Sequence, residues 1–219
     1  MLFTNFVVVS AQQDTIYVAG KISADHRQLS VSQEIIYFNT TSAPLDQIKL
    51  LNWVAAYQTR NTSLVNRKIQ DRKNDLYFAK PEELGRLQHL QIKVGEQMIS
   101  GADASVENIY VPLPKKLEPG ENVRLLLDYA VDLPARKFTG YGSDGRKIAL
   151  KYFFLVPDSF EEEDPSPKHF SDIEENQSPG NYWKVNLDVP VNYFSQSNLP
   201  EVQPNYFEGK LNTDPEFVI

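Results

Sequence analysis

The sequence predicts a mainly β, largely antiparallel protein with one or two short helices. The chain has 12 Phe, 11 Tyr and 2 Trp but only 10 Gly among its 219 residues. Runs of β-branched and aromatic residues, which favour strands, recur between short polar segments typical of turns. Because 41% of the residues are hydrophobic, a chain of this length can bury a large core. We therefore expect one large β domain over residues 12–219.

The first half of the chain predicts a hairpin, a third strand and a helix. Residues 15–24 and 29–39 are strand-like and are joined by a polar turn, and a third strand begins at residues 48–51. Asn61-Thr62-Ser63 then provides a good N-cap context, and apolar residues follow at helical spacing. We expect a helix around residues 63–76 and a second short one around 81–86, which Pro81 opens.

The second half predicts three more strands. Residues 124–133 alternate, so that Leu125, Leu127, Tyr129 and Val131 share one face. Residues 182–189 alternate in the same way. Residues 148–156 are too apolar to face water on either side, which indicates a strand buried between layers.

Composition excludes several classes of protein. Without cysteine the chain has no disulfide and no thiolate metal site. No hydrophobic stretch is long enough for a transmembrane segment. The net charge is −7, and residues 157–181 carry eight acids against one base, so a basic nucleic-acid surface is not expected. We expect this acidic loop to be exposed and irregular, at a domain interface or at the mouth of a cleft; whether it binds calcium stays open.

Two motifs suggest chemistry, but simpler interpretations fit them better. Gly140, Gly142 and Gly145 match the dinucleotide pattern GxGxxG, yet a strand-like segment follows instead of a helix. We interpret them as a hairpin turn in which Asp144-Gly145 takes positive φ angles. His26, His89 and His169 are far apart in sequence and predict isolated, exposed side chains. We assign no catalytic, cofactor-binding or metal-binding residues to this chain.

The order of several short motifs resembles the N-terminal domain of zinc aminopeptidases related to aminopeptidase N, of the secreted bacterial type. The matching places are residues 17–22 and 31–40, residues 45–50 with Trp53, Ala56 and Tyr57, the turn Leu117-Glu118-Pro119-Gly120, and Asp188-Val189-Pro190 with Ser197-Asn198-Leu199. The resemblance covers roughly residues 14–215.

The resemblance implies a saddle-like β-sandwich that is itself non-catalytic. Such a domain packs on a thermolysin-like catalytic domain, absent here, and walls the cleft for the peptide substrate. That missing domain carries the zinc through an HExxH motif, so the parent protein would be a zinc metalloaminopeptidase. The family often places a substrate-anchoring Gln or Glu at the position equivalent to residues 154–158. This chain has neither there, so we assign no anchor.

The two ends of the chain and its surface aromatics complete the expectations. Residues 1–11 resemble a truncated signal peptide, which predicts an exported protein, periplasmic, secreted or on the outer surface. The apolar end at residues 216–219 predicts truncation at the C-terminus. The alternative is a freestanding secreted β-sandwich that binds protein or glycan through Tyr141, Tyr193, Phe194 and Tyr206.

Overall fold

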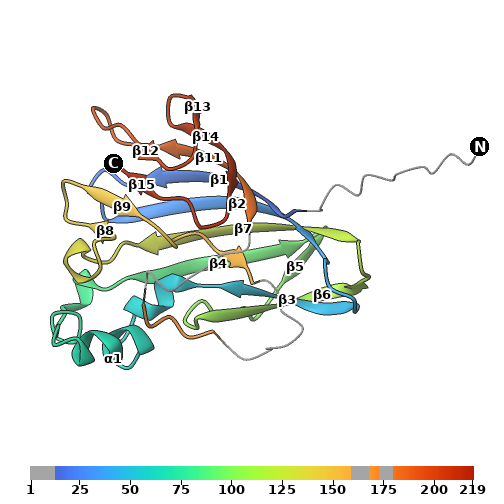
Figure 1. Cartoon of the computed structure of the whole chain (residues 1–219), viewed down its shortest axis with the longest axis horizontal. Helices are drawn as coiled ribbons and strands as arrows, with labels where there is room; N and C mark the ends of the chain where they lie inside the picture. The colour runs from blue at the N-terminus through green and yellow to red at the C-terminus, as the bar shows by residue number, and fades with distance from the viewer. Residues whose placement is uncertain (1–12, 159–167, 173–179) are drawn as a thin grey trace, which may run out of the picture.

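The computed structural model describes residues 13–158, 168–172 and 180–219 (Figure 1). The predicted mainly β fold is confirmed, with one large sheet and two small ones. The eight strands of the large sheet, in spatial order, are β13 (Glu201–Gln203), β14 (Tyr206–Leu211), β11 (Asn181–Asp188), β1 (Thr15–Ile22), β2 (Gln28–Phe38), β7 (Asn122–Asp132), β4 (Arg86–Val94) and β5 (Gln97–Ile99).

The small sheets complete the fold with a few short helices. The three-stranded sheet consists of β10 (Val156–Pro157), β3 (Leu45–Leu51) and β6 (Asn108–Leu117). The four-stranded sheet consists of β12 (Gln196–Ser197), β15 (Phe217–Val218), β9 (Ile148–Leu150) and β8 (Gly142–Ser143). The helices are α1 (Ser63–Gln70) and the 3₁₀ turns η1 (Trp53–Tyr57), η2 (Pro81–Glu83) and η3 (Arg136–Phe138). None of these described helices is long and apolar enough to cross a membrane.

One face of the large sheet forms the core and the other faces solvent. The predicted alternation in β7 is confirmed, since Leu125, Leu127 and Val131 are buried. Their cluster includes Ile48 from β3 and Ile148 from β9, so both small sheets contribute to the same core. Figure 1 shows β1, β2, β7 and β4 as long neighbouring strands. Their outward residues are left for solvent or for a ligand.

One strand pair in the large sheet departs from the antiparallel arrangement. β1 pairs antiparallel with β2, which confirms the predicted hairpin. Its other neighbour, β11, runs parallel to it. Parallel neighbours need a long connection, and here most of the chain lies between the two strands. The large sheet is therefore mixed.

The predicted helix over 63–76 is shorter in the structure. Its start is confirmed, because the Thr62 side chain accepts a hydrogen bond from the Val65 N–H at 3.3 Å. The helix ends at Gln70, where Arg72 adopts a left-handed φ of 60°. Hydrogen bonds from Arg72 N to Ile69 O and from Lys73 N to Lys68 O close the end, as in a Schellman motif. The second predicted helix is the single turn η2.

The prediction of one continuous strand over 148–156 was wrong, although its burial was right. β9 ends at Leu150, and Tyr152 has a left-handed φ of 62° that breaks the extended conformation. The segment resumes as β10 at Val156 on a different sheet. Tyr152, Phe153 and the two residues that follow are all at most 5% exposed.

Candidate functional site

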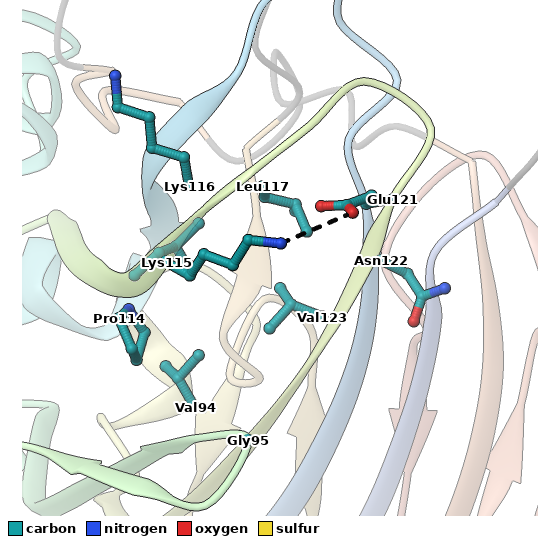
Figure 2. Close-up of a pocket in the computed structure, with 10 residues that line it drawn as sticks. Val94, Gly95, Pro114, Lys115, Lys116, Leu117, Glu121, Asn122 and Val123 are labelled. Atoms are coloured by element: carbon teal, nitrogen blue, oxygen red, sulfur yellow. Dashed lines mark ion pairs between the residues drawn. The ribbon is translucent and has the colours of Figure 1, made fainter.

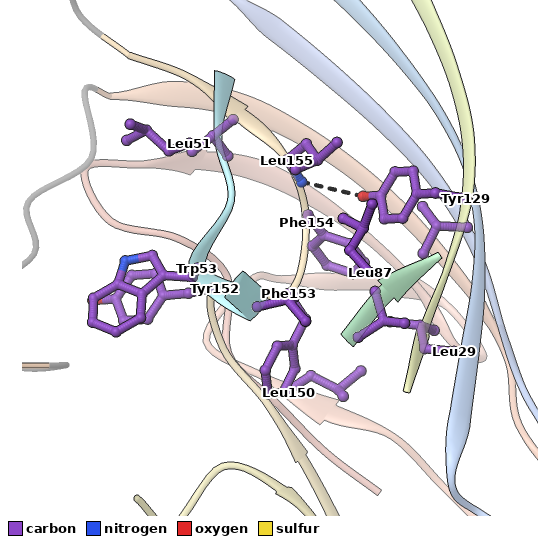
Figure 3. Packing of buried hydrophobic residues seen from close by; sticks show 14 of the residues in the cluster. Leu29, Leu51, Trp53, Leu87, Tyr129, Leu150, Tyr152, Phe153, Phe154 and Leu155 are labelled. Carbon is purple, nitrogen blue, oxygen red and sulfur yellow. Dashed lines mark hydrogen bonds between the residues drawn. The ribbon is translucent and has the colours of Figure 1, made fainter. Parts of the chain in front are cut away.

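The segment where the resemblance places a substrate anchor is closed in this protein. Phe154 and Leu155 are 5% and 1% exposed. The Gln33 side chain donates to Leu155 O at 2.6 Å, and the Tyr129 hydroxyl accepts from Leu155 N–H at 3.1 Å. The same hydroxyl donates to Gln33 Oε1 at 2.6 Å. Figure 3 shows the Tyr129 ring reaching this backbone N–H among buried aromatic and aliphatic side chains.

These contacts form a clamp, which we define as Gln33, Tyr129 and the backbone of Leu155. It ties the inward face of the large sheet to the buried segment and satisfies both polar backbone groups of one residue. Burial raises the pKa of the Tyr129 hydroxyl, so it is a neutral donor and acceptor at every physiological pH. The clamp is structural and offers no group to a substrate.

Asp158 corrects part of the prediction for the acidic loop. The sequence predicts that Asp158 belongs to an exposed segment, but its side chain is only 2% exposed. Its carboxylate lies 2.6 Å from Lys49 Nζ, itself 4% exposed, and 2.5 Å from Lys168 Nζ. Because a buried carboxylate is costly unless paired, the two lysines explain why this position can carry an acid. Most of the acidic loop, at 159–167 and 173–179, lies outside the described residues, as does the signal-like segment 1–11.

Residues 168–172, within that predicted loop, pack against the three-stranded sheet and η1. The Asn108 side chain donates to Lys168 O at 2.7 Å and accepts from Lys168 N–H at 3.0 Å. Phe170 is 2% exposed and stacks on Trp53 with ring centroids 4.4 Å apart. This part of the loop is therefore docked, against the expectation of full exposure.

The glycine motif forms the predicted hairpin. β8 and β9 pair antiparallel on either side of it, and Gly145 has a φ of 85°, whereas Asp144 does not adopt a positive φ. Asp144 instead accepts hydrogen bonds from the N–H groups of Arg146 and Lys147. At Gly142 an added Cβ would lie 1.9 Å from Pro134 O, so this glycine is required for close backbone packing.

The histidines stay apart in the fold. His26 packs edge-on against Tyr193, with ring centroids 4.6 Å apart. His169 Nδ1 lies 3.1 Å from Glu107 Oε2, and its ring is exposed. Within the described ranges, no group of three or more His, Asp or Glu side chains is placed to hold a metal ion.

A partly apolar groove lies between the β4–β5 hairpin, the end of β6 and the start of β7 (Figure 2). Val94, Leu117 and Val123 line it, and Lys115 stands at its rim 4.0 Å from Glu121. Its volume is about 460 Å³. This ion pair is exposed, so it contributes little binding energy of its own.

A second hollow, of about 470 Å³, lies on the outward face of the large sheet. Tyr17, Lys184 and Tyr206 line one side of it, and Glu34 and Asp128 line the other. These residues come from the neighbouring strands β14, β11, β1, β2 and β7. Of these residues, the sequence predicted only Tyr206 as a candidate binding residue. The strand order, which the sequence does not give, was needed to group the others with it.

The four surface aromatics of the binding-module alternative have different surroundings. Tyr206 lines the hollow, whereas Tyr193 packs on His26. Tyr141 lies under the ammonium group of Lys151, 5.5 Å from the ring centroid. Phe194 is 82% exposed in the turn that follows β11.

Three exposed apolar side chains close to the last strand in sequence or in strand pairing, Val191, Phe194 and Val218, make up what we call the terminal patch. These side chains are 87%, 82% and 46% exposed. Phe194 lies two residues before Gln196, the residue that pairs with Val218 across β12 and β15. The patch thus lies beside the last strand of the chain.

Comparison with known proteins identifies the fold. No protein-family model and no curated protein matches the sequence. Among solved structures, a mutant M1 zinc metallopeptidase from Deinococcus radiodurans matches 94% of this chain at 14% identity, with a TM-score of 0.50. The same mutant bound to a Tyr-Ser-Ala substrate matches 94% at 15% identity, with a TM-score of 0.51.

This chain spans 41% of the length of each of those two peptidase chains. The likeness lies in their N-terminal part, as the sequence motifs predicted. The chain therefore has the fold of the N-terminal β-domain of M1 zinc metallopeptidases.

Proposed function

We propose that this chain is the non-catalytic N-terminal β-domain of an exported, zinc-dependent aminopeptidase-like protein. It packs on a thermolysin-like catalytic domain and forms one wall of the peptide cleft. The observation that carries the proposal is the likeness of nearly the whole chain to part of a peptidase. In this proposal the zinc and the catalytic residues belong to the other domain.

The terminal patch supports a packing partner. Phe194 and Val191 are almost fully exposed, and large apolar side chains that gather on a surface commonly mark an interaction site. Because Val218 belongs to the same patch, a domain that follows residue 219 would start next to it. Covering these side chains removes apolar area from water and stabilises both domains.

The first experiment reads the coding sequence that follows the codon for Ile219. We expect an HExxH motif within roughly the next two hundred residues, the usual size range of a domain. An open reading frame of that length without the motif would contradict a zinc-peptidase parent.

The second experiment compares this chain with the extended protein. Phe194→Asp is expected to lower the melting temperature of the extended protein but not that of the 219-residue chain. Met98→Asp, at a position 59% exposed on β5, is the matched control and should change neither. Equal melting temperatures for the two extended variants would rule out the terminal patch as the interface.

A further inference from the structure

The hollow on the outward face of the large sheet has the dimensions of a ligand site. Its floor includes Ala19 of β1 and Ser32 of β2, which are register partners with small side chains. The flanking side chains of Tyr17 and Glu34, also register partners, are larger and stand above this floor. A volume of about 470 Å³ falls within the range of small-molecule sites.

The aromatic side of the hollow is held in place by a surface network. Glu208 accepts hydrogen bonds from the hydroxyls of Tyr206, at 2.9 Å, and Tyr182, at 2.7 Å. Lys184 Nζ lies 3.3 Å from Glu208 and 5.4 Å from the Tyr17 ring centroid. The hydrogen bond to Glu208 therefore holds the Tyr206 ring, and the ammonium group of Lys184 packs on the Tyr17 ring, so a ligand that stacks on Tyr206 loses little additional side-chain entropy on binding.

The charges around the hollow disfavour an anionic ligand and leave carboxylates that can accept hydrogen bonds from ligand hydroxyls. Arg124 makes a bidentate pair with Glu34, with both distances 2.7 Å, and Lys184 pairs with Glu208. Asp128 is exposed and forms no ion pair with any residue that the structure describes, which leaves one negative charge in excess. An anionic ligand would be repelled by this excess, whereas carboxylates accept hydrogen bonds readily from hydroxyls.

The position of the hollow argues against an extended peptide. β1 and β2 each have a paired strand on both sides, so their backbone groups are used within the sheet. A peptide that adds to a sheet needs an open edge. Recognition at this place must therefore come from side chains alone. They are the rings of Tyr17 and Tyr206, the carboxylates of Glu34 and Asp128, the amine of Lys184 and the hydroxyl of Ser32.

We propose that this hollow binds a neutral oligosaccharide. The apolar C–H face of a sugar ring stacks on Tyr17 or Tyr206, and its hydroxyls donate to Asp128 and Glu34. The site lies on the face of the large sheet opposite the core, and the inference does not depend on the proposed peptidase role.

The test titrates the 219-residue chain by calorimetry with cellotetraose, maltotetraose, mannotetraose and chitotetraose. A heparin tetrasaccharide serves as the anionic comparison. We expect at least one neutral sugar to bind with a Kd below ~1 mM, the weak range typical of a few contacts. Tyr17→Ala and Tyr206→Ala are each expected to weaken that binding about tenfold through loss of stacking.

Two further variants separate loss of the site from loss of the fold. Asp128→Asn keeps the shape of the side chain and is expected to weaken binding about tenfold, since a bond to a charged acceptor is lost. Tyr110→Ala is the matched control, because Tyr110 is 41% exposed on β6 whereas Tyr17 is 38% exposed on β1. Its affinity should equal that of the unaltered chain.

Three results would overturn the inference. The first is that none of the four neutral sugars binds at 10 mM, about ten times the expected Kd. The second is that only the heparin fragment binds. The third is that Tyr110→Ala weakens sugar binding as much as Tyr17→Ala does. Each variant is accepted only if its melting temperature matches that of the unaltered chain; Asp128→Asn keeps the test decisive if a tyrosine variant fails to fold.

Discussion

Replacing Tyr129 by phenylalanine tests the clamp that joins the large sheet to the buried segment after β9. The change removes one hydroxyl and keeps the ring, so the packing of the core is preserved. It leaves Leu155 N–H and Gln33 Oε1 without the partners they now have at 3.1 and 2.6 Å. Both groups are buried, and water has no ready access to them.

The expected cost follows from the number of groups left unpaired. A buried polar group that loses its partner costs about 1–3 kcal/mol, so two groups with partial relaxation give about 2–4 kcal/mol. This is a large fraction of the ~5–15 kcal/mol that holds a typical domain folded. Gln33→Met should cost a similar amount, because it leaves Leu155 O without its donor and the Tyr129 O–H without its acceptor, although the hydroxyl oxygen still accepts from Leu155 N–H.

The assay is urea unfolding followed by tryptophan fluorescence, since Trp53 and Trp183 are buried and change environment on unfolding. The double variant Gln33→Met/Tyr129→Phe is expected to cost less than the sum of the single variants by about 1 kcal/mol or more, because the two residues share one network. Tyr110→Phe, at an exposed position, is the control. A loss below about 0.5 kcal/mol for Tyr129→Phe would refute the reasoning, as would strict additivity.

Three further predictions concern buried charge and backbone packing. Burial raises the pKa of Asp14 to about 6 from 3.8, so the folded state is penalised as pH rises through this window. Asp14→Asn should raise stability by only about 0.5 kcal/mol at pH 4 and by up to about 3 kcal/mol at pH 8 in urea unfolding. An equal gain at both pH values would contradict this. Gly142→Ala should lower the free energy of unfolding by about 3 kcal/mol or more, because the added Cβ overlaps a backbone oxygen. Gly145→Ala meets open space and should lower it by about 1 kcal/mol, because of its φ of 85°. Similar melting temperatures for the two variants would contradict this distinction. Lys49→Met should lower the free energy of unfolding by about 3 kcal/mol in the same assay, because it removes a partner of the buried Asp158. The double variant Lys49→Met/Asp158→Leu should recover most of that loss. A double variant no more stable than the single one would show that the pairing is not the cause.

The strands that sequence reasoning found are those whose pattern is local. Alternation over 124–133 and 182–189 gives β7 and β11 nearly complete, because inward and outward residues of a strand differ in polarity wherever one face is buried. The N-cap at Thr62 and the turn at Gly145 are local in the same sense. These elements can be predicted from the sequence without knowing which strands lie beside them.

The strands that sequence reasoning missed depend on their place in a sheet. β6 contains Pro112 and Pro114, which argue against a strand when the neighbours are unknown. In the structure β6 is the edge of the three-stranded sheet, where a missing N–H is tolerated. β4 has a register shift beside His89, which adopts a left-handed φ of 56° and interrupts the alternation.

The sequence by itself determined the fold class, the first hairpin, the alternating strands and, through the order of its short motifs, the likeness to an aminopeptidase N-terminal domain. Only the tertiary structure decided that β11 runs parallel to β1, that Asp158 is buried between two lysines, and that Tyr17, Lys184 and Tyr206 line one hollow. Propensity and periodicity act over a few neighbouring residues and can be read along the chain. Which strands become neighbours, and which charges are removed from water together, depends on residues more than a hundred positions apart that meet only when the whole sheet has formed.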